Sequence, residues 1–336
     1  MRTVTILASL LFMAISWGHH SDAGLDMDNI TIVEGTVTGY YFRNPHVYFT
    51  VAVPDASGET VEWSMQMGSA ITSARRGWTP DSLVEGDVVR VEIHASVDGR
   101  PYGIADYVDK EGGVISNAPF YEPAETASTD SLEGLWMAVS SELVVYPGGF
   151  DGFFRAQLTL NGKALAAQAS YDELSAENPN STCVGRPTPA MIVMSAYYPL
   201  EIEFLDNDII AIRREFYDEE RLVYMDGRAH PDVSQRFDRG HSIGFWDGDV
   251  LVVDTRNFSD NRSPYQIGVP SGAEKHVVER YELADDGQSV FVEFVLEDPE
   301  YLIGSMTHRR ELVYAPDYEM MSFECDIESS RRFILN

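Results

Sequence analysis

The chain has little basic charge. Its 336 residues include 24 Lys and Arg against 54 Asp and Glu, which gives a formal net charge of −30 at pH 7. Proteins that bind nucleic acids or anionic membrane surfaces contact the negative charges mainly through Lys and Arg. The composition therefore excludes a nucleic-acid partner and disfavours an anionic membrane surface. Apolar residues make up 44% of the chain, which is enough to build packed cores.

Long apolar runs are also scarce. The one clear run, residues 4–15, follows Arg2 and is shorter than the roughly 20 residues that cross a bilayer. A basic residue before a short apolar run is typical of a signal peptide. We expect residues 1–18 to be removed by cleavage before His19, or alternatively after Ala23. The protein is then predicted to be exported to the periplasm or the extracellular space, with no segment inserted in a membrane.

Cysteine is nearly absent. Cys183 and Cys325 are the only two, and neither lies in a CxxC motif, which argues against a thiol redox site. In an oxidising compartment an even number of cysteines predicts a disulfide between them.

The familiar cofactor and nucleophile motifs are missing as well. The sequence contains no GxGxxG after a strand, no phosphate-binding Walker loop, no HExxH and no GxSxG. Nucleotide chemistry and standard serine hydrolysis are therefore disfavoured, and no organic cofactor is expected.

The N-terminal half shows a regular order of short elements. Alternating apolar residues and turn signals predict strands at residues 30–42, 47–53, 60–65, 88–93 and 102–108, with a helix at 68–77 between the third and fourth strands. Three strands, a helix and two strands are the order of the five-stranded OB barrel. We expect an OB-like β domain over residues 28–112 and an exposed linker at 113–131.

Residues 132–336 predict a second, larger β domain. Strand pairs flank turn signals at Asp247-Gly248, Asp286-Gly287 and Pro316-Asp317, the last pair being residues 308–314 and 320–325. The Ala-rich residues 158–169 form either a hairpin around Asn161-Gly162 or a short helix. Consecutive hairpins predict an antiparallel up-and-down, lipocalin-like barrel, because closure removes the open edges of the sheet. The fold class is therefore all-β with two barrels.

Each half of the chain contains a set of distinctive motifs. The N-terminal motifs are His19-His20-Ser21, Asn44-Pro45-His46 and Arg75-Arg76-Gly77-Trp78. The C-terminal motifs are DGRxHP at 226–231, GHSIG at 240–244, WDGDxLVVDT at 246–255 and HVVER at 276–280. Together these motifs resemble two exported bacterial families of unknown function, fused in one chain. The resemblance implies export, a small N-terminal barrel and a C-terminal barrel, and it implies no established reaction.

Histidines near the predicted N-terminus form the first candidate site. His19, with its α-amino group, and His20 or His46 would give a nitrogen-rich set of the kind that binds copper. Alternatively, the terminal histidines bind metal only adventitiously, and His46 belongs to a simple turn.

A polar set in the second domain forms the second candidate site. A His beside a carboxylate can act as a general base, and an Arg can hold a carboxylate or an enolate. The candidate catalytic residues are His241, His276, Asp254, Glu279, Arg221 and Arg280. Because residues i and i+2 of a strand share a face, His241 lies with Ile243 and Phe245 and is predicted to point into an apolar interior. The alternative is a structural network of ion pairs and turn contacts.

Aromatic residues form the third candidate site. Small-molecule pockets are mostly apolar with a few polar groups, although each aromatic residue taken alone is as well explained by the core. The aromatic set is Phe150, Phe153, Phe154, Tyr197, Tyr198, Phe216, Tyr217, Phe245 and Trp246. The candidate substrate-binding residues are Tyr217, Arg228, His230, Phe245 and Trp246.

These observations lead to three functional hypotheses. The first is a binding protein that holds a small, largely apolar or aromatic molecule in the second barrel. The alternative is a cofactor-free acid–base enzyme of the isomerase, lyase, cyclase or hydratase type on the same barrel. The third is a copper-handling protein that uses the N-terminal histidines.

Overall fold

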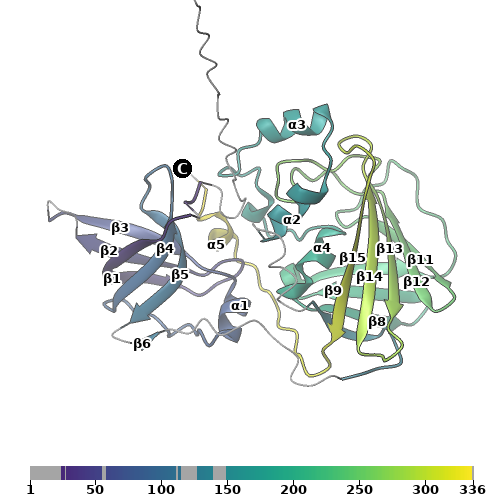
Figure 1. The fold of residues 1–336 in the computed structure, drawn as a ribbon, viewed down its shortest axis with the longest axis horizontal. Coiled ribbons are helices and arrows are strands. Elements are labelled where there is room, and N and C mark those ends of the chain that lie inside the picture. The colour runs from purple at the N-terminus through teal and green to yellow at the C-terminus, as the bar shows by residue number, and fades with distance from the viewer. Residues whose placement is uncertain are drawn as a thin grey trace, which may run out of the picture.

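Two β barrels lie side by side in the computed structural model, with helical segments between them (Figure 1). The structure describes residues 24–26, 28–54, 58–110, 113–114, 127–138 and 149–334. The predicted all-β class with a small barrel followed by a larger one is confirmed.

The first barrel has the strand order of an OB fold. Its strands are β1 (Thr31–Tyr41), β2 (Tyr48–Pro54), β3 (Thr60–Gln66), β4 (Val88–Ala95), β5 (Tyr102–Lys110) and the short β6 (Gly113–Val114). The order is β3-β2-β1-β4-β5-β6, and a parallel pairing of β3 with β5 closes the barrel. Helix α1 (Ala70–Arg75) joins β3 to β4 and begins where the Ser69 side chain accepts a hydrogen bond from the Thr72 amide. The predicted order of elements is confirmed.

The second barrel has nine strands. They are β7 (Gly134–Met137), β8 (Leu200–Leu205), β9 (Ile209–Arg214), β10 (Glu219–Tyr224), β11 (His241–Asp247), β12 (Val250–Arg256), β13 (His276–Leu283), β14 (Ser289–Glu297) and β15 (Ser305–Tyr314). They close in the order β10-β11-β12-β13-β14-β15-β7-β8-β9. The up-and-down pattern has one exception, because β10 and β11 pair in parallel. Residues 225–240 return the chain to the end of the barrel where β10 began, so β11 runs in the same direction.

The predicted strand at residues 320–325 is wrong. β15 pairs with β7, through Val313 with Met137 and Tyr314 with Trp136, and this pairing closes the barrel. Residues 320–325 instead leave the barrel, and their backbone amides bond to carboxylates rather than to a neighbouring strand. The Met321 amide donates to Glu215 at 2.7 Å and the Phe323 amide donates to Asp218 at 2.8 Å.

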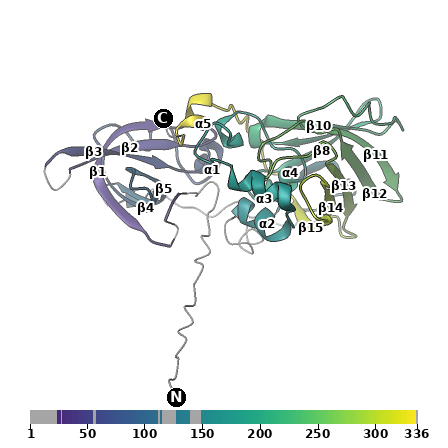
Figure 2. The same ribbon diagram turned by 90° about the horizontal axis from the view of Figure 1, so that it is seen from above.

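A helical segment fills the mouth of the second barrel. It contains α2 (Gly149–Gln157), α3 (Gly162–Ala169), η2 (Pro179–Ser181), α4 (Ala190–Val193) and η3 (Met194–Ala196), and the view from above shows α1, α2 and α4 between the strands of the two barrels (Figure 2). The Asn161 side chain accepts hydrogen bonds from the amides of Lys163 and Ala164 and so caps a helix. Of the two predicted alternatives for the Ala-rich residues, the helix is therefore the one that forms. Phe153 and Ile192 pack with inward-facing strand residues in one buried cluster. The interior of the barrel is therefore occupied by the protein's own side chains.

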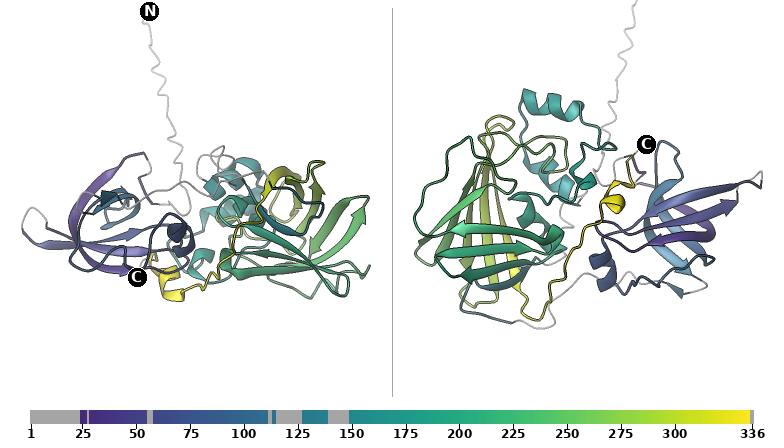
Figure 3. Two further views of the ribbon diagram at one scale, coloured as in Figure 1. Left: turned by 90° about the horizontal axis from the view of Figure 1, so that it is seen from below. Right: turned by 180° about the vertical axis from the view of Figure 1, so that it is seen from behind.

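The C-terminal segment connects the two barrels. It runs from β15 to α5 (Ile327–Arg331) beside the first barrel (Figure 3). The predicted disulfide Cys183–Cys325 is confirmed, with its Cα atoms 5.7 Å apart. Arg75 of α1 also donates to Glu215, which is fully buried, at 2.8 Å. Within the described residues, no helix is long and apolar enough to cross a membrane.

Candidate functional site

A cavity of about 460 Å³ lies between the two barrels. This inter-barrel cavity is within the range of about 300–1,000 Å³ that is usual for small-molecule sites. Its walls come from the turn before β2, from α1, from the helical segment of the second barrel, and from residues 216, 217 and 266 of that barrel. The lining residues are Pro45, His46, Gly68, Ser69, Thr72, Arg76, Phe150, Asp151, Asn180, Arg186, Met194, Tyr197, Tyr198, Phe216, Tyr217 and Gln266.

The Asn44-Pro45-His46 motif builds one wall of the cavity. Asn44 is buried, and its Oδ1 accepts from the Ile71 amide of α1 at 3.3 Å. Its Nδ2 donates to the carbonyl of Phe323 in the C-terminal segment. One side chain thus fixes the turn against both elements. The motif therefore places His46 at the cavity.

The histidine of this motif has a defined tautomer. His46 Nδ1 lies 3.3 Å from the carbonyl oxygen of Met67, and because a carbonyl only accepts, Nδ1 carries the proton. Burial lowers the pKa of His46 to about 4, although the bond to Met67 opposes this and the charge of Arg186 reinforces it. The ring is therefore neutral at pH 7, and its Nε2 is an acceptor.

The structure leaves the copper hypothesis open. His19 and His20 lie outside the described residues. Among the described residues, no group of three or more His, Cys, Asp or Glu is arranged to hold a metal ion. A copper site that includes His46 therefore stays a prediction.

Two arginines line the cavity, and one of them, Arg186, lies over its aromatic walls. Arg186 is 3% exposed, and its guanidinium carbon lies 5.4 Å from the ring centre of Phe150 and 5.6 Å from that of Phe216. Burial lowers the pKa of Arg186 and that of Arg76, the second cation of the lining, and both remain charged at pH 7 because arginine starts from a very high value. Even with Asp151 ionised, the lining carries a net positive charge in a strongly acidic protein.

Tyr217 contributes a strained residue to the cavity. Its φ of 61° and ψ of 22° lie in the left-handed region, which is unfavourable for a bulky side chain. Ring contacts with Phe216 and Phe323, at centroid distances of 4.4 and 4.8 Å, hold it there. Burial raises the pKa of Tyr217 to about 12, so its hydroxyl stays protonated. Strained residues that their surroundings hold in place cluster at functional sites.

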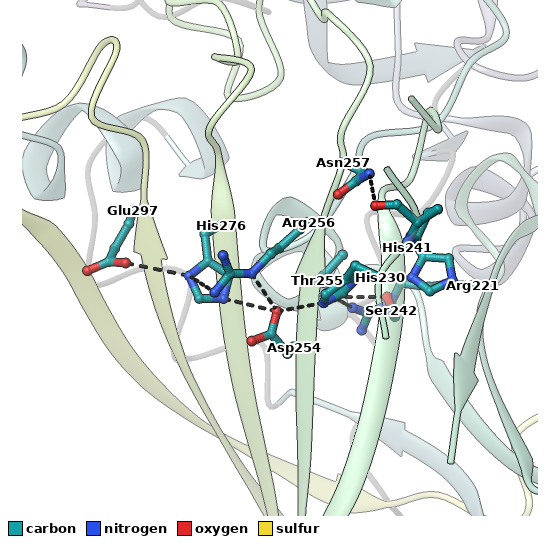
Figure 4. A network of polar contacts seen from close by, with 11 residues as sticks. Arg221, His230, His241, Ser242, Asp254, Thr255, Arg256, Asn257, His276 and Glu297 are labelled. Atoms are coloured by element: carbon teal, nitrogen blue, oxygen red, sulfur yellow. Dashed lines mark hydrogen bonds and ion pairs between the residues drawn. The ribbon is translucent and has the colours of Figure 1, made fainter. Parts of the chain in front are cut away.

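A second polar arrangement lies on the outer wall of the second barrel (Figure 4). Asp254 of β12 sits between two imidazoles, with its Oδ1 3.0 Å from His230 Nε2 and 3.0 Å from His276 Nε2. His230 Nδ1 lies 3.0 Å from His241 Nδ1. We call these four residues the histidine row.

The direction of each hydrogen bond follows from the carboxylate. Asp254 only accepts, so His230 donates to it through Nε2. When His230 is neutral, its Nδ1 accepts from the Nδ1–H of His241, and Nε2 of His241 is then unprotonated. Burial alone would raise the pKa of Asp254, but the bond and charge of His276 and the charge of Arg256 lower it to about 2. Burial lowers the pKa of His241, and the charges of His230 and Arg228 lower it further.

The predicted inward orientation of His241 is wrong. In β11 the buried residues Ser242 and Gly244 face the interior, while His241 and Ile243 lie on the outer wall. The apolar residue Ile243 suggested an inward face, but this face is outward and is apolar because residues 225–240 partly cover it. Phe237 of that loop lies 5.8 Å from His241, measured between ring centres.

The six predicted catalytic residues therefore separate into three places. His241, His276 and Asp254 belong to the histidine row. Arg221 and Glu279 form a buried ion pair inside the barrel, with Arg221 Nη1 2.6 Å from Glu279 Oε2, and Thr188 donates to the same carboxylate. Arg280 is exposed and pairs with Asp247 at 2.9 Å.

The predicted substrate-binding residues are divided as well. Tyr217 lies at the cavity, together with Phe150, Tyr197, Tyr198 and Phe216 of the aromatic set. His230 belongs to the histidine row, and Arg228 pairs with Asp226 on the surface. Phe245 and Trp246 are 55% and 47% exposed, and Trp246 contacts Phe204 of β8.

Sequence reasoning missed the cations of the cavity. Arg186 is the only charged residue between Glu177 and Glu201, within a stretch rich in proline and apolar residues. A single arginine in an otherwise apolar stretch is the signal that could have identified Arg186. Such a residue is expected to be buried with its surroundings, and a buried arginine needs polar or aromatic partners of the kind that line a site.

Comparison with known families covers the first barrel. The profile of a family of unknown function (DUF6152) matches residues 7–105. The N-terminal part of the chain is thus similar to a family without an assigned activity, as the motifs predicted. No curated protein sequence matches the chain. The resemblance of the second domain stays a prediction.

Proposed function

We propose that the protein binds a small, ring-containing organic anion in the inter-barrel cavity. The observation that carries the proposal is the lining itself: the buried guanidinium of Arg186 lies over the rings of Phe150 and Phe216, and Tyr217 lines the same cavity. Flat aromatic walls suit a planar ring, and guanidinium groups suit a carboxylate. The ligand is of the aromatic kind expected from the sequence, but its place is between the barrels, since core side chains fill the second barrel.

Benzoate should bind to the wild-type protein more tightly than benzamide, because only benzoate carries a charge for Arg76 and Arg186. Arg76→Gln should weaken benzoate binding about 10- to 100-fold, the range for losing a hydrogen bond to a charged group. Thr72→Phe should abolish binding, since the ring would occupy the cavity that Thr72 lines. Isothermal titration calorimetry measures each effect.

Arg43→Gln is the matched control, because Arg43 is an exposed arginine of the same barrel outside the cavity lining. Its affinity for benzoate should equal that of the wild type. The proposal is wrong if no aromatic carboxylate binds the folded wild type, or if Thr72→Phe binds benzoate as tightly as the wild type does.

The histidine row favours a second candidate function, a cofactor-free acid–base enzyme of the isomerase, lyase, cyclase or hydratase type. The specific observation is the contact between His230 Nδ1 and His241 Nδ1 beside Asp254, which leaves His241 Nε2 unprotonated when His230 is neutral. Asp254 and His230 would act as positioning residues that hold this tautomer, as the carboxylate does in other His-based proton-transfer sites.

Exchange of the acidic C–H protons of phenylpyruvate in D₂O, followed by NMR, tests the second candidate. Wild-type protein should accelerate exchange, and His241→Ala should lower the acceleration about 10²- to 10⁴-fold, the usual contribution of a general base. Asp254→Asn should lower it as well, because an amide can donate to His230 and reverse the tautomers. His94→Gln removes a histidine of β4 outside the row and should leave exchange unchanged. Equal exchange in wild type and His241→Ala would rule this function out.

A further inference from the structure

The inter-barrel cavity is lined by acceptor oxygens of several side chains, Asp151 and Asn180 among them, and by one imidazole, that of His46. Arg76 and Arg186 only donate hydrogen bonds, whereas the neutral His46 ring accepts through Nε2. Its Nδ1 is engaged by the Met67 carbonyl, and the described residues give Nε2 no hydrogen-bond partner. Nε2 is therefore the ring atom available to a ligand in the cavity.

We propose that His46 Nε2 accepts a hydrogen bond from a hydroxyl group of the bound molecule. The ligand class is then a hydroxylated aromatic carboxylate. This inference rests on the proposed function and narrows it from any ring-containing anion to one with a second polar group.

The charge around His46 favours a neutral donor over a cationic one. Arg186 is close enough to His46 to oppose protonation of its ring, so it also repels an ammonium group at that place. An O–H group meets Nε2 without adding positive charge. A ligand ring whose only polar group is a carboxylate would exclude water from His46 Nε2. It would leave this buried acceptor without a hydrogen bond, which is unfavourable.

The geometry also orients the ligand. His46 belongs to the first barrel and Arg186 to the second, and both line the same cavity. A molecule with its hydroxyl at His46 and its carboxylate at the guanidinium groups would contact both barrels. Sites built to bond a hydroxyl discriminate strongly against analogues that lack it.

Calorimetric titration with 2-, 3- and 4-hydroxybenzoate, benzoate and the matching methoxybenzoates tests the proposal. At least one hydroxybenzoate should bind wild-type protein about 10- to 100-fold more tightly than benzoate, and its methoxy counterpart should lose that advantage. His46→Phe should remove the preference and keep benzoate binding. His46→Gln, which retains an acceptor oxygen, should preserve part of the preference.

The outcomes separate this inference from the function on which it rests. If benzoate binds with the expected dependence on Arg76 but no hydroxybenzoate binds more tightly, the role of His46 is overturned and the proposed function stands. If no benzoate binds, both fail. If a hydroxybenzoate is preferred and His46→Phe keeps that preference, His46 is not the acceptor.

A measurement on the wild type covers the case in which His46→Phe does not fold. The ¹⁵N signal of His46 Nε2 should be that of an unprotonated nitrogen, and it should shift with the preferred hydroxybenzoate but not with its methoxy counterpart. The preference should hold from pH 8 to 6 and disappear as the pH approaches about 4, where Nε2 becomes protonated and stops accepting. An Nε2 signal that does not respond to the hydroxybenzoate overturns the proposal.

Discussion

Replacing Cys183 and Cys325 together by serine is expected to lower the free energy of unfolding by about 5 kcal/mol. The disulfide joins residues separated by 142 positions in the sequence, and the chain-entropy relation for a loop of that length gives this value at 25 °C. The loop contains α4, η3 and every strand of the second barrel except β7. Loss of the bond therefore increases the conformational entropy of this part of the unfolded chain.

Urea unfolding of the oxidised wild type and of the double serine variant measures the difference. Wild-type protein unfolded in the presence of a thiol reductant should match the variant, and the variant itself should not respond to the reductant. Benzoate affinity should fall in both cases, because Cys183 and Cys325 pack against Tyr198, Phe216 and Tyr217 of the cavity wall. A change in unfolding free energy below about 1 kcal/mol would contradict the expected role of the bond.

Arg221→Met is expected to lower the free energy of unfolding by about 3–5 kcal/mol, which is the second-largest of the effects predicted here. Glu279 is fully buried, and removal of its partner leaves its charge in the barrel with hydrogen bonding from Thr188 but without the cation. The double variant Arg221→Met with Glu279→Gln should recover most of this loss, because the amide can still accept from Thr188 and carries no charge. A double-mutant cycle from urea unfolding gives the coupling.

Arg280→Gln is the control for this cycle. Arg280 is the exposed neighbour of Glu279 in β13, and its pair with Asp247 should contribute less than about 1 kcal/mol. If Arg221→Met and Arg280→Gln lower the free energy of unfolding by the same amount, the buried pair contributes no more to stability than a surface pair. The expected loss for Arg221→Met would then be wrong.

The sequence was sufficient to predict both barrels because their strands are short, regular and separated by clear turns. The first barrel follows directly from the order of its elements, and β13 shows the alternation of a strand, with Glu279 and Tyr281 buried and His276 on the outer face. These are local properties, since the period of two and the turn residues act within one hairpin.

The errors arise where distant segments meet. His241 was placed inside because residues 225–240 partly cover its outer face. Residues 320–325 have the composition of a strand, but carboxylates of the 215–218 turn bond to their amides. The cavity joins His46 to Arg186, and no local pattern connects residues so far apart. The fold could therefore be predicted from local order, while the candidate site depends on how the two barrels pack.

The connection made by the C-terminal segment also sets the order in which the cavity can be completed. Every strand of both barrels precedes residue 315, yet Cys325 and Phe323, which pack against the cavity wall, come later. All the strands of a newly made chain therefore leave the ribosome before the residues that complete the packing of the cavity wall. The wall between the barrels is thus the part of the structure whose packing is completed last during synthesis.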